Sequence, residues 1–191
     1  LMKNICYVIS GIDKALAFEW ISELLDKNKY KLFFVLLHSS KGELEDYLIT
    51  HNVPCIRIQY KNKKDLISAT FKTYKFLKRN KIDIVHSHLL DAGLVGILAA
   101  TMAGIKTRIY SRHYSTYHHI YFPKGIWYDK IINRLSSKIL AISNVVKNVL
   151  VEKEQVNPNK IQILHHGFPL EKFDEIQTEQ IKKLKTKYKF A

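Results

Sequence analysis

The sequence contains few acidic residues. Its 17 Asp and Glu stand against 31 Lys and Arg, which gives a formal net charge of +14 at pH 7. Such a surface attracts anions, and nucleic acid, acidic lipid and phosphorylated substrates all fit that description. Much of the charge is expected on solvated helix faces, as in "KTYKFLKRNK" (72–81), whose apolar residues have amphipathic spacing. The charge therefore indicates an anionic partner without choosing one.

Long apolar runs and cysteines are also scarce. No stretch approaches the roughly 20 apolar residues that a membrane-spanning helix needs, and the N-terminal "LMKNICYVIS" is too short for a signal peptide. The two cysteines, Cys6 and Cys55, lie in apolar runs that resemble strands, which favours free buried thiols over a disulfide between them. We expect a cytoplasmic protein, with peripheral attachment to the inner face of a membrane left open.

The glycine-rich motifs of nucleotide binding are missing. The chain has 7 glycines in 191 residues, and neither G-x-G-x-x-G nor G-x-x-x-x-G-K-[ST] occurs, nor does the G-x-S-x-G nucleophile elbow. These absences argue against the common dinucleotide, phosphate-loop and hydrolase sites. Gly11, after the first apolar run, still permits close approach of an anion to a helix N-terminus, and a tight turn is the plainer alternative.

What is present is a regular alternation of strand and helix patterns, over a length that suits one domain. The expected strands are 4–10, 31–38, 54–60, 82–88, 106–113, 138–143 and 160–167, and the expected helices are 13–28, 42–52, 64–80, 91–103, 127–137, 144–154 and a mostly polar 174–190. Apolar strands without polar alternation indicate a sheet that is covered on both faces. The pattern predicts a Rossmann-like, doubly wound α/β fold with a mostly parallel sheet of about seven strands.

Polar side chains gather where these strands end. The strand ends are Ser10-Gly11, His38, His86-Ser87-His88, His113, Ser143 and His166-Gly167. In doubly wound folds, ligands bind beyond the carboxyl ends of the strands. Several hydrogen-bonding groups on one edge therefore predict a lined cleft, although capping alone also explains Ser143.

His86 and His88 admit three interpretations. Residues two apart in a strand face the same side, so both imidazoles could meet one metal ion. No cysteine or H-E-x-x-H lies nearby to complete such a site, and we expect no metal. A structural histidine that is hydrogen-bonded in the core, and a contact with an acceptor or sugar at the cleft, both stay open.

An aromatic and basic stretch follows the fifth expected strand. In "RIYSRHYSTYHH" (108–119) the residues of interest are Arg112, His113, Tyr114, Tyr117, His118 and His119. Aromatic rings stack on sugars or bases, and basic groups hold phosphates. The stretch therefore fits a sugar site, a nucleic-acid surface or an ordinary, partly buried loop. No RRM, KH or helix-turn-helix signature supports the nucleic-acid alternative.

Taken in order, these pieces resemble the N-terminal domain of a GT-B glycosyltransferase of family 4. The matching stretches are "DIVHSHLLDAGLVGILAATMAGIKTRIYSRH" and "SSKILAISNVVKNVLVEKEQVNPNKIQILHHGFPLEKF". The family pattern has a strand ending in H-x-H, a strand ending in T-x-H, a strand reading "AVS" and a last strand ending in N-G before D-x-x-x-F. This sequence departs from it at His166, where Asn is usual, at Pro169, where Asp is usual, and at Ser10-Gly11, where Gly-Gly is frequent.

The resemblance implies a function and a division into domains. Residues 1–175 would form the acceptor-side domain, and 176–191 would begin a linker to a C-terminal donor-binding domain that this chain lacks. The intact enzyme would move a sugar from a nucleotide-sugar donor to a glycan or lipid-linked acceptor, with retention of configuration and without a metal or other cofactor. This chain alone would fold but would be inactive. The alternatives are a basic nucleic-acid-binding α/β module and another GT-B sugar enzyme, such as an epimerase.

The resemblance also assigns roles to residues. His113 would act in catalysis, through a hydrogen bond to a hydroxyl of the reacting sugar. Because successive side chains of a strand point to opposite faces, Arg112 is expected on the other face of this strand end. The donor contacts would be Gly11, Ser143 and Gly167. The acceptor contacts would be His86, His88, Arg112, Tyr114, Tyr117 and His118.

Overall fold

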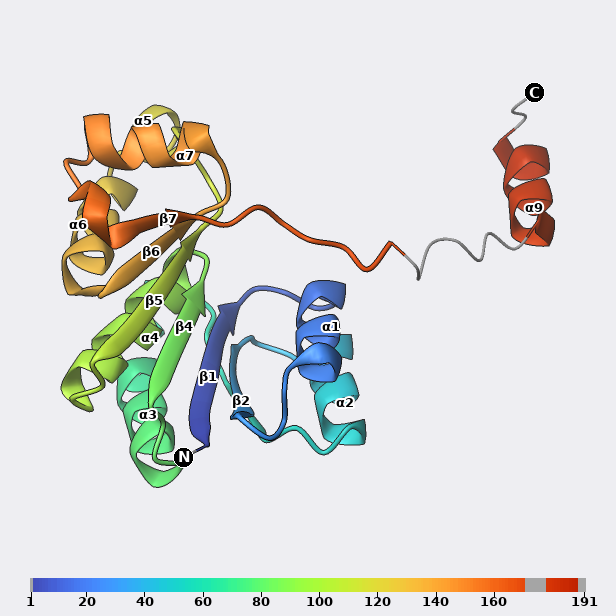
Figure 1. Ribbon diagram of the computed structural model, residues 1–191, viewed down its shortest axis with the longest axis horizontal. Helices are drawn as coiled ribbons and strands as arrows, with labels where there is room; N and C mark the ends of the chain where they lie inside the picture. The colour runs from blue at the N-terminus through green and yellow to red at the C-terminus, as the bar shows by residue number, and fades with distance from the viewer. Residues whose placement is uncertain (1, 171–177, 189–191) are drawn as a thin grey trace.

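The computed structural model describes residues 2–170 and 178–188 and confirms the doubly wound α/β fold (Figure 1). Seven parallel strands form one sheet in the order β3-β2-β1-β4-β5-β6-β7. The strands are β1 (Lys3–Ser10), β2 (Tyr30–Leu37), β3 (Cys55–Ile58), β4 (Ile84–His88), β5 (Thr107–Arg112), β6 (Lys138–Ala141) and β7 (Ile161–Ile163). The order reverses between β1 and β4, and such a switch point is where doubly wound folds bind ligands.

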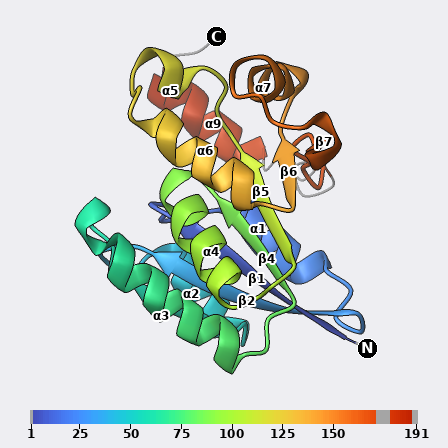
Figure 2. The same ribbon diagram turned by 90° about the vertical axis from the view of Figure 1, so that its left-hand side faces the viewer.

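Helices cover both faces of the sheet. They are α1 (Leu16–Leu24), α2 (Glu43–Thr50), η1 (Lys63–Asp65), α3 (Leu66–Arg79), α4 (Leu90–Met102), α5 (Tyr117–Ile120), α6 (Gly125–Leu135), α7 (Asn144–Asn148), the π-helix η2 (Val149–Lys153), η3 (Pro158–Lys160) and α9 (Thr178–Tyr188). Helices α1 and α2 pack on one face, and α3, α4 and α6 pack on the other (Figures 1 and 2). Within residues 2–170 and 178–188, no helix is both long and apolar enough to cross a bilayer.

The core follows from the alternation of side chains along the central strands. In β1, Val8 packs toward α3 and α4, whereas Ile9 packs toward α1 and α2. Helix α4 approaches the sheet closely through its glycines, because a Cβ atom at Gly96 would lie 2.2 Å from Ser87 Oγ. This close packing fixes the β4–α4 turn, where the candidate site begins.

Three helix predictions need correction in detail. The first helix spans Leu16–Leu24 rather than 13–28, and the stretch predicted as a loop after β5 contains the short helix α5. The helix expected over 144–154 is divided into α7 and the π-helix η2. The final helix is described over Thr178–Tyr188, and the domain boundary expected near residue 175 lies outside the described residues.

The expectation that both cysteines are free is confirmed. Cys6 is fully buried in β1, as expected, whereas Cys55 is only half-buried at the start of β3. Burial raises the pKa of the Cys6 thiol, so this sulfur stays protonated and serves as a packing group.

Candidate functional site

Four histidines lie in a line along the carboxyl edge of the sheet. We call His86, His88, His113 and His166 the histidine row. The rings of His86 and His88 are 4.3 Å apart between centroids, since side chains two apart in β4 share one face. His88 Nδ1 lies 3.0 Å from His113 Nε2, and the His113 ring stacks on His166 at 5.4 Å. The row therefore links the ends of β4 and β5 to the segment that follows β7.

The row changes from buried to exposed along its length. His86 and His88 are buried, His113 is half-buried and His166 is exposed. Burial lowers the pKa of His86 to about 3, with a smaller contribution from His113. Burial also lowers the pKa values of His88 and His113, and the neighbouring histidines lower them further. These three imidazoles are therefore neutral at pH 7, so each can offer one N–H donor and one nitrogen acceptor.

A pocket of about 420 Å³ opens beside the row, at the switch point of the sheet. It is lined by Ser10, Gly11, Leu37, His38, Ser39, Tyr60, Lys61, Leu89, Leu90 and Asp91. Asp91 accepts a hydrogen bond from the Tyr60 hydroxyl at 2.9 Å and is ion-paired with Lys63. Its carboxylate is thus held at the wall of the pocket. The Tyr60 hydroxyl is engaged by Asp91, His38 Nδ1 by Ser40, and Ser10 Oγ accepts from Ala92 N, so Ser39, Lys61 and the O–H of Ser10 are the groups left to a polar ligand.

Strained backbone marks the turn between the row and the pocket. Leu89, directly after His88, has φ 69° and ψ 166°. This conformation is essentially restricted to glycine and costs on the order of 1–3 kcal/mol for another residue. Such strain occurs preferentially at ligand sites, and here it lies at the N-terminus of α4, on the pocket wall.

The residues predicted to contact the donor lie along the same edge. Gly11 has φ 64°, and a Cβ at this position would have no other atom within 4 Å, but the Gly11 N–H already donates to the Leu37 carbonyl at 3.2 Å. Ser143 caps α7 by accepting a hydrogen bond from Val146 N at 3.3 Å, which leaves its own O–H free to donate. Gly167 is exposed. The geometry keeps all three at the edge, and their donor contacts stay predictions.

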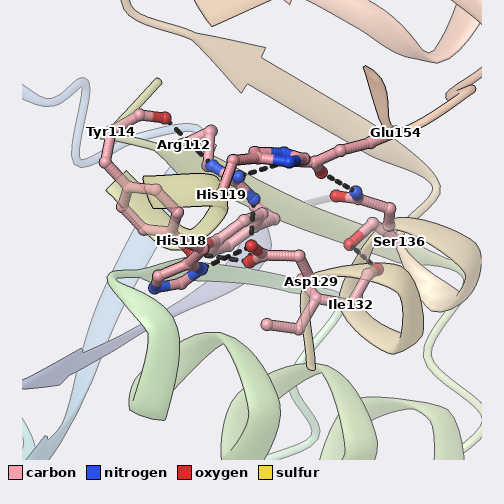
Figure 3. Close-up of polar contacts among 10 residues, drawn as sticks. Arg112, Tyr114, His118, His119, Asp129, Ile132, Ser136 and Glu154 are labelled. Carbon is pink, nitrogen blue, oxygen red and sulfur yellow. Dashed lines mark hydrogen bonds and ion pairs between the residues drawn. The ribbon is translucent and has the colours of Figure 1, made fainter. Parts of the chain in front are cut away.

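Arg112 points away from the row, as expected, into a buried polar cluster (Figure 3). Its guanidinium has no exposed area and pairs with Asp129 of α6 at 2.8 Å and with Glu154 after η2 at 2.5 Å. Arg112 Nε also donates to the Tyr114 carbonyl at 3.0 Å. His118 Nδ1 lies 2.5 Å from Asp129 Oδ2. We call these five residues the Arg112 cluster.

The structure divides the residues predicted to contact the acceptor into two groups. Tyr117 is exposed, and His86 and His88 belong to the row. Arg112 and His118 are buried in the Arg112 cluster, and the Tyr114 hydroxyl donates to Asp129 at 2.5 Å. Contact of these six residues with an acceptor stays a prediction. The burial of Arg112 and His118 favours a structural role, in which they hold the segment between β5 and α6 in place.

Sequence reasoning missed the partners that organise both groups. Asp129 and Glu154 were not selected, although Asp129 is the only acidic residue between 92 and 151. That isolation in a basic stretch is a signal of a buried ion pair. His166 was predicted only as part of a polar strand end and as a departure from the family pattern, yet its ring stacks on His113. Among the described residues, no group of three or more metal-ligating side chains has a geometry that would hold a metal.

Two curated relatives are similar to this chain over most of its length. One is the UDP-Gal:alpha-D-GlcNAc-diphosphoundecaprenol alpha-1,3-galactosyltransferase of Escherichia coli, which is 27% identical over 87% of this chain and 44% of its own length. The other is the capsular polysaccharide biosynthesis glycosyltransferase CapH of Staphylococcus aureus, which is 33% identical over 72% of this chain and 39% of its own length. The chain therefore spans less than half the length of these relatives.

Solved structures share the fold. Anabaena Alr3699/HepE, in complex with UDP-glucose, superposes with a TM-score of 0.76 at 15% identity, over 97% of this chain and 49% of that one. The UDP-GlcNAc 2-epimerase of Methanocaldococcus jannaschii superposes with a TM-score of 0.60 at 15% identity, over 84% of this chain and 45% of that one. Likeness in fold at this identity does not separate a transferase from an epimerase.

Sequence similarity does separate them. The model of the family described as Glycosyltransferase Family 4 matches residues 21–172. This range contains strands β2 to β7 and all four histidines of the row. Since the match covers most of the 191 residues, the chain belongs to glycosyltransferase family 4.

Proposed function

We propose that this chain is the acceptor-side domain of a retaining glycosyltransferase, which moves a sugar from a nucleotide-sugar donor to a glycan or lipid-linked acceptor. One observation carries the proposal: in a chain of family 4, His113 lies at the carboxyl edge of the sheet between His88 and His166. A C-terminal domain would complete the donor site. UDP-sugars are the first donors to test, because UDP or UDP-Gal appears in the names of similar proteins.

In this proposal, His113 acts through a hydrogen bond to a hydroxyl of the transferred sugar. Its half-buried ring is held by neighbours on two sides, so it can meet the sugar without first being ordered. The neutral state that burial favours lets one ring nitrogen donate while the other pairs with His88. Contacts that strengthen as the glycosidic bond breaks lower the barrier to transfer.

The leaving group is a nucleotide diphosphate, on which negative charge develops during the reaction. Donors that are already oriented toward that charge stabilise the transition state. On this side of the cleft, the free O–H of Ser143 is suited to the task, whereas the Gly11 N–H is engaged by Leu37. Gly11 would instead let the donor approach the backbone closely, since the space that a Cβ would occupy has no other atom within 4 Å. No step in the proposal uses a metal ion.

The pocket beside Gly11 would receive the acceptor. It combines Lys61, the hydroxyls of Ser10 and Ser39, and the imidazole of His38, a set that can bind hydroxyl and phosphate groups. A lipid-linked acceptor that carries a diphosphate, as named for the E. coli relative, presents both kinds of group.

The test is a transfer assay on the complete gene product. With a UDP-sugar and a lipid diphosphate-linked sugar, we expect a new glycosidic bond with the anomeric configuration of the donor, and no transfer by residues 1–191 alone. Inversion of configuration would refute the retaining mechanism. Epimerisation of a UDP-sugar without transfer would favour the epimerase alternative, and transfer by the 191-residue chain would contradict its role as half of the site.

A further inference from the structure

The ring of His113 makes a single hydrogen bond within residues 2–170 and 178–188. This bond joins His113 Nε2 to His88 Nδ1 at 3.0 Å. The terminal torsion of a histidine has broad minima, so a half-buried imidazole that is held at one nitrogen can still turn about that bond. Such a turn would move the other nitrogen, Nδ1, away from a sugar hydroxyl. A contact on the face of the ring would remove this freedom.

His166 makes that contact. Its ring is stacked on the His113 ring, with the centroids 5.4 Å apart and the planes inclined by 24°. The His88 ring, in contrast, meets His113 through the hydrogen bond at its edge. The two contacts restrict different rotations of His113, since one holds a ring nitrogen and the other covers a ring face.

The backbone on both sides of the stacked histidine is anchored. Leu164 N donates to the Ala141 carbonyl at 2.9 Å, which ties the segment to the end of β6. The Phe168 ring meets Trp20 of α1 edge-on, with the centroids 6.0 Å apart. We call residues 164–168 the strap. It crosses the strand ends from β6 toward α1, so the ring that it carries is held over the histidine row (Figure 1).

We propose that His166 is a positioning residue, which holds the His113 ring in the orientation that meets the transferred sugar. The inference rests on the proposed function, in which His113 contacts a hydroxyl of that sugar. Contacts that hold a reacting group in place before the reaction lower the barrier to it. The family pattern usually has Asn at position 166, and an amide offers no aromatic ring, so the stack is a feature of this chain.

The exposure of His166 also allows a different role, in which its own ring nitrogens bind the sugar. The two roles need different parts of the side chain. A direct contact requires a nitrogen that donates or accepts a hydrogen bond. The stack requires only an aromatic ring, which phenylalanine also provides. Substitution by Phe therefore separates positioning from direct binding.

The experiment measures sugar transfer by the complete protein, with a UDP-sugar and a lipid diphosphate-linked acceptor. His166→Phe should retain turnover within about twofold. His166→Ala and His166→Asn should each lower turnover by roughly 3- to 10-fold, the range that one aromatic contact supplies. The KM values for donor and acceptor should stay unchanged, because an oriented His113 acts on the transition state. The melting temperature should hardly move, since His166 is exposed.

His51 provides a matched control. It is exposed and is stacked on Tyr47 with the same inclination of 24°, but it lies after α2, beside the start of β3. His51→Ala should leave turnover unchanged. An equal loss in His166→Phe and His166→Ala would overturn the inference in favour of direct binding by the ring nitrogens. Normal turnover of His166→Ala, or a loss that follows a lower melting temperature, would also overturn it.

The stack itself can be measured in the 191-residue chain, without catalysis. Proton NMR should show ring-current shifts of the His113 ring protons in the wild type and in His166→Phe, and their loss in His166→Ala. Unchanged His113 signals in His166→Ala would overturn the inference even if the complete protein transfers sugar. Absence of transfer by the wild-type complete protein would contradict the proposed function instead, and the NMR comparison would still decide whether His166 orients His113.

Discussion

His88 is buried against Phe18 and Tyr7, and its Nε2 has no hydrogen-bond partner among the described residues. Its other nitrogen, Nδ1, lies 3.0 Å from His113 Nε2, and one of these two nitrogens donates a hydrogen bond to the other. If His113 donated, the neutral His88 would carry its proton on the unpartnered Nε2. Because a buried N–H without a partner is rarer than an unpartnered acceptor, we infer that His88 Nδ1–H donates to His113.

This inference predicts the tautomer of His113. Its proton should reside on Nδ1, which makes that nitrogen the donor for the proposed hydrogen bond to a sugar hydroxyl. Nitrogen-15 NMR of the 191-residue chain at pH 7.5 should show a protonated Nδ1 for His113 in the wild type and a mixture of tautomers in His88→Phe. His38→Phe, outside the row, should have no effect. A protonated Nε2 on His113 in the wild type would contradict the inference.

The buried histidines also predict how stability depends on pH. The pKa of His86 is lowered from 6.5 to about 3, and that of His88 is lowered as well, so the folded state binds fewer protons than the unfolded state below pH 6.5. Stability present above pH 6.5 should therefore be lost as the pH falls toward 3, by up to about 1.4 kcal/mol per pH unit for each histidine. Urea unfolding at pH 7.5, 6.5 and 5.5 measures this slope. His86→Gln should reduce it, and an unchanged slope in that variant would argue against a buried neutral His86.

At the scale of the elements, the Arg112 cluster joins the end of β5 to α6 and to the end of η2. Arg112→Met would leave Asp129 and Glu154 as buried carboxylates without their cation, which should cost about 3–5 kcal/mol. Urea unfolding should show this loss, and Arg79→Met, at an exposed position near the end of α3, should change stability by less than about 0.5 kcal/mol.

A triple variant tests whether unpaired charge is the cause. Adding Asp129→Asn and Glu154→Gln to Arg112→Met should recover part of the lost stability, because the buried negative charges are removed together with the cation. If Arg112→Met barely changed stability and instead weakened acceptor binding in the complete protein, the acceptor role predicted from the sequence would be correct.

The elements themselves were largely predictable, because their signals are local. Apolar runs such as "KLFFVLLH" (31–38) and the helical spacing of 64–80 indicate single elements, and their alternation determines the sheet. The partners within the Arg112 cluster are separated by up to 42 residues, as in the pair of Arg112 and Glu154. No periodicity encodes such a pair, and the short helix α5 depends on contacts of this kind. Strand alternation therefore predicted the correct face of β5 for Arg112, but it did not predict the partners Asp129 and Glu154.

At the scale of the whole molecule, the histidine row and the pocket lie at the carboxyl edge of the sheet, near the switch point between β1 and β4. Helices α1 and α2 cover one face of the sheet and α3, α4 and α6 cover the other, and ligands of doubly wound folds bind beyond the edge that such helices leave uncovered (Figures 1 and 2). The proposed C-terminal domain would then close over the histidine row from beyond the strand ends.

We propose that the half-buried His113 acts in sugar transfer, whereas the buried His86 stabilises the fold. The most direct measurement compares His113→Ala with His86→Ala in the complete protein, by turnover in sugar transfer and by melting temperature. His113→Ala should lower turnover by roughly 10²-fold or more, the range for a lost transition-state hydrogen bond, and leave the melting temperature nearly unchanged. His86 holds Ser111 at 2.8 Å in the core, so His86→Ala should lower the melting temperature and reduce turnover only with the folded fraction. Near-normal turnover of a stably folded His113→Ala would contradict a catalytic role for His113.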